Sequence, residues 1–78
     1  MNELSEGAYG PLINAEQRVG GPIGIIGGTT EEQEAVYAEL LAAGLITKRY
    51  NLTRKGAGVA WREAVDYFEN GNPHKRIG

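Results

Sequence analysis

The sequence predicts a small α+β domain that is mostly helical, with two main helices and a short β-strand or hairpin between them. Residues 29–44 and 53–70 each combine a helix-capping threonine, apolar residues at helical spacing, and a glycine or asparagine stop signal. Residues 45–52, between them, are rich in β-formers that alternate with polar residues. We therefore expect residues 29–70 to form a helix–strand–helix core.

The first main helix is expected over residues 31–43. Thr29 or Thr30 can cap it, because a hydroxyl accepts a hydrogen bond from a free amide of the first turn, and a glutamate or glutamine three residues later completes a capping box. Gly44 is the expected left-handed stop. The face expected to be buried carries Val36, Tyr37, Leu40 and Leu41.

The second main helix is expected to begin after a Thr53 cap and to end at Asn70-Gly71. Its apolar residues recur at steps of three and four, which places them on one face. They are Ala57, Ala60, Trp61, Ala64, Val65 and Phe68. We expect this face to pack on the first helix, with Trp61 in the core between them. The alternative is an exposed Trp61, which would be a candidate interface anchor.

The connecting segment 45–52 is expected to be a strand or a cramped hairpin with one polar face. Ile46, Tyr50 and Leu52 share one side of an extended chain, so we expect them to face the core.

Residues 1–28 are rich in glycine and weakly patterned. A short helix is expected to begin at Gly10-Pro11, because proline is tolerated in a first turn. The run 20–28, GGPIGIIGG, predicts a short buried strand or a tightly folded loop.

The length of 78 residues predicts one small domain over residues 1–70, followed by a flexible basic tail at 71–78 that holds His74, Lys75 and Arg76. The chain has no cysteine, so we expect no disulfide and no thiolate chemistry. The apolar runs are too short to span a bilayer and no secretion signal is visible, so we expect a cytoplasmic protein without a membrane partner.

No residue pattern predicts catalysis. The single histidine lies in the tail, and no histidines and carboxylates have metal-ligand spacing. The glycine run precedes a helix, but its spacing fits neither the dinucleotide fingerprint nor the P-loop, and three glutamates follow it. We therefore expect a protein that is not an enzyme and that holds no cofactor or metal.

Charge is distributed unevenly along the chain. Residues 1–36 hold six acidic residues against one arginine, net −5, whereas residues 37–78 hold seven basic residues against four acidic ones, net +3. Two electrically opposite halves indicate self-association or two different contact surfaces. An ordinary mixed surface is the alternative.

The run AVYAELLAAGLITKRYNLTRKGAGVA resembles the second half of winged helix-turn-helix domains. The residues that match the pattern L-x-x-x-G-L-I are Leu40, Gly44, Leu45 and Ile46, with Leu41 beside them. Those that match Y-x-L-T-x-K-G are Tyr50, Leu52, Thr53, Lys55 and Gly56. The resemblance implies a small winged-helix-like domain in which helix 31–43 enters the DNA major groove and a wing touches phosphates.

The leading end of helix 31–43 is acidic, whereas a helix that reads DNA bases needs basic or amide side chains there. We therefore expect a non-enzymatic protein-binding module that docks this end on a basic surface of a larger protein. The expected protein-binding residues are Glu31, Glu32, Glu34 and Glu39. In size and style such a chain resembles small inhibitor or accessory proteins of phages, including DNA mimics that block CRISPR complexes.

The alternative is a winged-helix transcription regulator that uses a basic hairpin on DNA phosphates and acts as a homodimer. Its expected nucleic-acid-binding residues are Lys48, Arg49, Arg54 and Lys55, with Lys75 and Arg76 of the tail in support.

Overall fold

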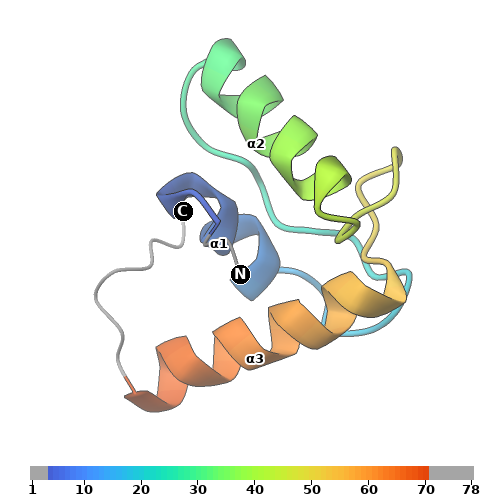
Figure 1. The fold of residues 1–78 in the computed structure, drawn as a ribbon. Helices are drawn as coiled ribbons and strands as arrows, with labels where there is room; N and C mark the ends of the chain where they lie inside the picture. The colour runs from blue at the N-terminus through green and yellow to red at the C-terminus, as the bar shows by residue number, and fades with distance from the viewer. Residues whose placement is uncertain (1–3, 71–78) are drawn as a thin grey trace.

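The computed structural model describes residues 4–70, which form three helices, α1 (Glu6–Ile13), α2 (Thr30–Ala42) and α3 (Arg54–Asn70) (Figure 1). Both long helices pack on the short helix α1, and α2 and α3 do not pack on each other. The expectation that the two main helices form the core by direct contact is therefore wrong. The predicted tail, 71–78, lies outside the described residues.

The predicted α+β class is also wrong, because residues 4–70 contain three helices and no strand. The segment expected to be a strand or hairpin makes only two isolated antiparallel bridges, Ile46 with Leu52 and Pro22 with Asn51. One reason is that the loop beside residues 50–52 leaves them after Ile23. The Ile23 N–H donates to the Tyr50 carbonyl at 3.0 Å, but the Gly24 N–H donates to the Pro11 carbonyl at 2.8 Å, so the ladder extends no further.

The second reason is a tight turn within the segment. Tyr50 has a left-handed backbone, with φ of 63°, which reverses the chain. The Thr47 carbonyl accepts the Tyr50 N–H at 3.1 Å, and the Thr47 hydroxyl accepts the Arg49 N–H at 3.2 Å. These bonds hold residues 47–50 in a turn, and across it the described residues are bridged only at Ile46 and Leu52, so neither side extends into a strand.

Helix α1 spans Glu6–Ile13, so Gly10-Pro11 lies in its second half, whereas the sequence predicted a helix that begins there. Pro11 lies inside the helix and is fully buried, as are Ala8 and Leu12. Proline removes one backbone hydrogen bond from a helix interior. Burial of these apolar side chains offsets that loss.

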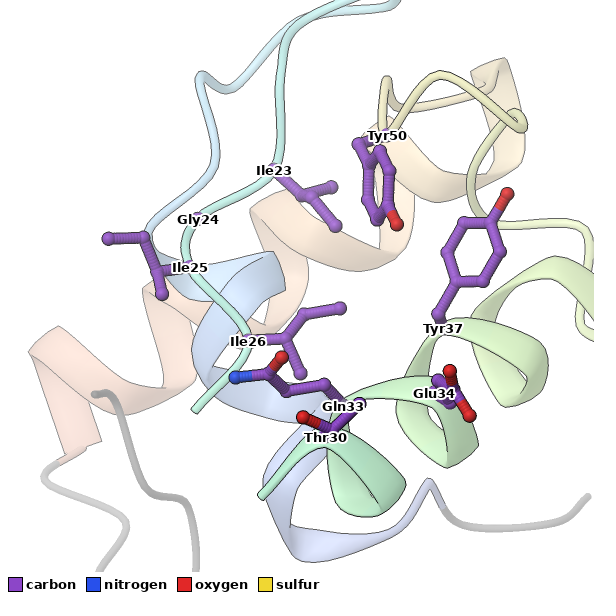
Figure 2. Close-up of a pocket in the computed structure, with 9 residues that line it drawn as sticks. All are labelled: Ile23, Gly24, Ile25, Ile26, Thr30, Gln33, Glu34, Tyr37 and Tyr50. Atoms are coloured by element: carbon purple, nitrogen blue, oxygen red, sulfur yellow. The ribbon is translucent and has the colours of Figure 1, made fainter. Parts of the chain in front are cut away.

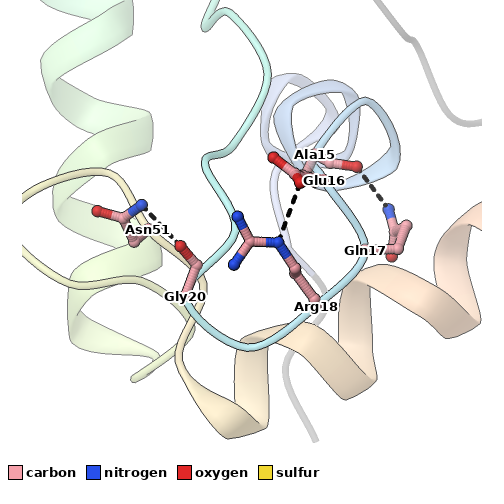
Figure 3. A network of polar contacts seen from close by, with 6 residues as sticks. All are labelled: Ala15, Glu16, Gln17, Arg18, Gly20 and Asn51. Carbon is pink, nitrogen blue, oxygen red and sulfur yellow. Dashed lines mark hydrogen bonds and ion pairs between the residues drawn. The ribbon is translucent and has the colours of Figure 1, made fainter.

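The carboxyl end of α1 is capped by the side chain of Gln17. Its Nε2 donates to the carbonyl oxygens of Leu12 at 3.0 Å and Ala15 at 3.2 Å, and Figure 3 shows the bond to Ala15. The last carbonyl oxygens of a helix have no hydrogen-bond donor within the helix, and the Gln17 side chain supplies a donor here. This contact holds the chain as it leaves α1.

The predicted ends of α2 are confirmed. The Thr29 hydroxyl accepts the Glu32 N–H at 3.2 Å, and the Glu32 carboxylate accepts the Thr29 N–H at 2.9 Å, which completes a capping box. Gly44 has a φ of 73°, and the Leu45 N–H donates to the Leu40 carbonyl at 3.0 Å. This is the Schellman arrangement that glycine favours at a helix end.

The predicted Thr53 cap of α3 is confirmed as well. Its hydroxyl accepts the Gly56 N–H at 3.0 Å and donates to the Gly44 carbonyl at 2.6 Å. One hydroxyl therefore starts α3 and ties it to the residue that ends α2.

The inward face of α3 consists of small residues, Gly56, Ala60 and Ala64, which are all buried. A Cβ atom at Gly56 would overlap the Leu45 carbonyl oxygen, so the two backbones lie in direct contact. Trp61 is 62% exposed and Phe68 is 67% exposed, so the prediction that Trp61 lies in the core is wrong. Because α3 approaches so closely, only small side chains fit beneath it.

The glycine-rich segment 20–28 is a loop that lies along residues 50–52, so the expectation of a tight loop is confirmed and that of a strand is wrong. The Leu52 N–H donates to the Gly21 carbonyl at 2.8 Å. The Asn51 side chain donates to the Gly20 carbonyl at 2.9 Å (Figure 3). These bonds fix the loop that passes on to α2.

The hydrophobic core joins residues from all three helices and from the turn. Val36 and Leu40 of the predicted α2 face are buried, and Tyr37 and Leu41 are half-buried against the core. The buried cluster consists of Ala8, Leu12, Ala15, Val36, Leu40, Leu45, Ile46, Leu52 and Ala60.

Gly56→Ala is expected to lower the free energy of unfolding by about 1–3 kcal/mol, because the new methyl group must displace the Leu45 backbone. Gly58→Ala is the matched control within the same helix, since a Cβ there meets no atom within 4 Å. It is expected to stabilise by about 0.5–1 kcal/mol. Urea unfolding of both variants measures this, and equal effects would contradict the close approach of α3 to Leu45.

Candidate functional site

An open groove of about 520 Å³ lies between α2, the loop 23–26 and the turn that ends at Tyr50 (Figure 2). The side chains of Ile23 and Ile26 point toward the groove, whereas Ile25 points away from it and is 89% exposed. We call this site the tyrosine groove. Its lining residues are Ile23, Gly24, Ile25, Ile26, Thr30, Gln33, Glu34, Tyr37 and Tyr50.

Two tyrosines form one wall of the groove. The rings of Tyr37 and Tyr50 lie with centroids 4.7 Å apart and tilted by 32°. The Tyr37 hydroxyl donates to the Lys48 carbonyl at 3.1 Å, which fixes that ring against the turn. A left-handed backbone is unusual for a bulky residue, and Tyr50 adopts it at the point where its ring meets Tyr37. The result is an ordered aromatic surface that is partly open to solvent.

The acidic end of α2 adjoins this wall. Glu34 lines the groove, and Glu31, three residues earlier, is its neighbour on the helix surface. Both are exposed. Two carboxylates at this spacing repel each other weakly, so a cation placed between them is stabilised.

The other two predicted acidic residues have structural roles. The hydrogen bonds from the Thr29 backbone and hydroxyl hold the pKa of Glu32 below its ordinary value of 4.5. The Glu39 carboxylate accepts the Ser5 N–H at 2.7 Å and the Ser5 hydroxyl at 2.5 Å, which ties α2 to the start of α1. The structure therefore places Glu34 in the groove lining, with Glu31 beside it on the helix surface but outside the lining, and uses Glu32 and Glu39 within the fold.

The four residues of the alternative site lie at the other end of α2, near its carboxyl terminus (Figure 1). Lys48 and Arg49 lie in the turn, and Arg54 and Lys55 open α3. All four are exposed. Cations are unfavourable in the first turn of a helix, where the helix dipole is positive, so the positions of Arg54 and Lys55 are electrostatically costly.

Sequence reasoning missed the groove. The sequence predicts Tyr37 on a buried helix face and Tyr50 on the apolar side of a strand. It predicts no binding role for the isoleucines of the loop. The groove depends on contacts between segments far apart in the chain, which no local spacing indicates. The only local signal is the presence of isoleucines between glycines at Ile23–Ile26.

Within residues 4–70, no three histidine or acidic side chains gather in a way that could hold a metal ion. In the same range, no helix has both the length and the apolar content needed to cross a bilayer. Comparisons of the chain with protein-family models, curated proteins and solved structures found no match.

The lowered pKa of Glu32 predicts an acid-dependent loss of stability. Because the folded pKa lies below 4.5, the stabilisation is present above that pH and is lost as the pH falls through the lowered value. Glu32→Gln, whose amide can still accept the Thr29 N–H but cannot titrate, is expected to lose less stability on acidification.

Urea unfolding between about pH 3 and pH 6 measures this difference. Glu31→Gln is the matched control, because Glu31 lies in the same turn and takes no part in the capping box. If the Glu32 and Glu31 variants show the same pH dependence, the assignment of the acid-sensitive bond to Glu32 is wrong.

Proposed function

We propose that this chain is a non-enzymatic protein-binding module that docks the acidic end of α2 and the tyrosine groove on a basic segment of a partner protein. The observation that carries the proposal is the position of Glu34, which lines one groove together with the paired rings of Tyr37 and Tyr50. Carboxylate and aromatic groups side by side complement the two parts of a lysine or arginine side chain.

Each part of the groove has a chemical counterpart in such a partner. The aliphatic stem of a lysine or arginine packs along the tyrosine rings, and its cation lies beside Glu34 and Glu31. A neighbouring apolar residue of the partner contacts Ile23 and Ile26 on the opposite wall. Complementary charge also speeds association, and this contribution weakens with salt.

Binding of this kind inhibits a partner protein by covering part of the partner's surface. A basic partner surface that serves nucleic acid would be blocked by the acidic end of α2, which is the action of a DNA-mimic inhibitor such as those that phages direct at CRISPR complexes. This role requires no catalytic group and no cofactor.

The proposal predicts where a basic peptide binds. In NMR titrations of the labelled chain at low salt with a synthetic peptide rich in lysine and arginine and containing one tryptophan, amide signals of residues 23–26 and 31–37 are expected to shift. Glu34→Gln is expected to weaken binding by about tenfold, because it removes the carboxylate beside the rings.

Glu16→Gln is the control, since Glu16 is an exposed carboxylate paired with Arg18 at 3.0 Å, away from the groove, and its substitution changes the net charge equally. Equal weakening by both substitutions would mean that only net charge matters. That result, or shifts confined to other residues, would contradict the proposal.

A second candidate function is DNA binding through the basic turn. It is favoured by Arg54 and Lys55, whose cost at the start of α3 would be offset by a phosphate. With a short duplex in place of the peptide, this function predicts shifts at residues 48–49 and 54–55 and affinity that falls steeply with salt. Lys48→Glu with Arg49→Glu would then abolish binding, whereas Glu34→Gln would not weaken it.

A further inference from the structure

One face of α3 lies open to solvent and carries large apolar side chains. Trp61, Val65 and Phe68 follow one another at steps of four and three residues, so they form a stripe along one side of the helix. Trp61 is 62% exposed and Phe68 is 67% exposed, and Val65 between them is half-buried. We call these three residues the α3 stripe.

The described part of the chain covers the stripe only in part, since Val65 is half-buried and the Phe68 ring contacts the Tyr67 ring edge-on with centroids 5.2 Å apart. In residues 4–70 the helix that packs on α3 is α1 (Figure 1). The buried inward row of α3 is Gly56, Ala60 and Ala64, of which Gly56 lies against the Leu45 backbone. Successive residues of a helix are about 100° apart around its axis, so Trp61 points well away from the inward Ala60. Scattered exposed apolar residues are ordinary, but two exposed aromatic rings aligned with a valine on one helix face indicate an interface.

Charges beside the stripe indicate what covers it. Lys55, Arg62 and Glu69 are seven residues apart, which places them along one flank of α3, and all three are exposed. The flank is therefore basic toward the start of the helix and acidic at its end. A second α3 in the opposite direction would place Glu69 beside a basic residue, whereas a parallel one would place like charges together.

We propose that two copies of this chain associate through their α3 helices, antiparallel and crossing at Val65. In this register Trp61 lies against Phe68 of the second copy, and Arg62 lies beside Glu69 of the second copy. Because the arrangement has two-fold symmetry, each contact is made twice. The dimer surface uses no residue of the tyrosine groove, so it is independent of the proposed binding function.

The expected interface is small. A fully buried aromatic side chain contributes roughly 150–250 Å², and about two-thirds of each ring is exposed in the monomer, so the four rings of two copies bury on the order of 400–650 Å². This lies below the range of stable specific interfaces, which predicts a weak, reversible dimer whose population depends on concentration.

Trp61 is the only tryptophan of the chain, so its fluorescence reports on this surface directly. As the concentration rises from about 1 μM to about 500 μM, sedimentation is expected to change from monomer to dimer. Over the same range the Trp61 emission is expected to shift to shorter wavelength, because the ring leaves water. A monomer at every concentration, with unshifted emission, would overturn the proposal.

Charge exchange tests the antiparallel register. Glu69→Arg alone is expected to weaken the dimer by about tenfold, because two ion pairs are replaced by repulsion with Arg62. The same holds for Arg62→Glu alone, and the double variant Arg62→Glu with Glu69→Arg is expected to restore the dimer. If the double variant dimerises no better than the single ones, the register is wrong.

Phe68→Ala is expected to weaken the dimer by on the order of a hundredfold, since it removes two aromatic contacts. Circular dichroism of each variant at low concentration shows whether the monomer still folds. Because Phe68 and the two charged side chains are exposed, the monomer is expected to melt as the original does. A dimer that persists after Phe68→Ala would contradict the proposed surface.

Discussion

Burial of the short helix α1 between the two longer helices is the constraint on which the structure depends. Ala8 and Leu12 are fully buried in the cluster that also holds Leu40 of α2 and Ala60 of α3. Polar contacts strengthen the same position, since Ser5 binds Glu39 of α2 and Gln17 caps the end of α1. A small domain has few apolar side chains to bury, so it relies heavily on a helix that two others share.

The position of α1 also explains where the two candidate surfaces lie. Because α2 and α3 pack on α1 and not on each other, the tyrosine side of α2 is left to meet the loop 23–26, which forms the groove. The close approach of α3 at Gly56 admits only small side chains, so the α3 stripe is left in solvent. The groove contains no residue of α3, and the stripe contains none of α2.

The helix ends could be predicted from the sequence because capping is local. Thr29, Gly44 and Thr53 each act on residues within one or two turns, and all three have the predicted roles. The same local pattern predicts that a residue three positions after the cap completes the capping box, as Glu32 does. Glu34, which lines the groove, was among the four acidic residues predicted to bind a partner. The sequence pattern did not distinguish it from Glu39, which binds Ser5 within the fold.

The errors arose where distant contacts decide the outcome. Pro11 lies inside α1, where burial of its ring offsets the lost hydrogen bond, and residues 45–52 form no strand because the loop beside them, which is remote in sequence, turns away after Ile23. The sequence predicted one apolar face of α3 that mixes small and aromatic residues, and close contact with Leu45 means that the small residues are buried while Trp61 and Phe68 stay exposed. Helical periodicity alone does not distinguish these faces.

If α1 supports both α2 and α3, loosening its packing should loosen both long helices equally, which amide hydrogen exchange can measure. Leu12→Val, which removes one buried methylene, is expected to cost about 1 kcal/mol and so to speed exchange by about fivefold. The same acceleration is expected for core amides of both long helices, such as those of Leu40 and Ala60. Acceleration confined to one long helix, or absent from both, would contradict it.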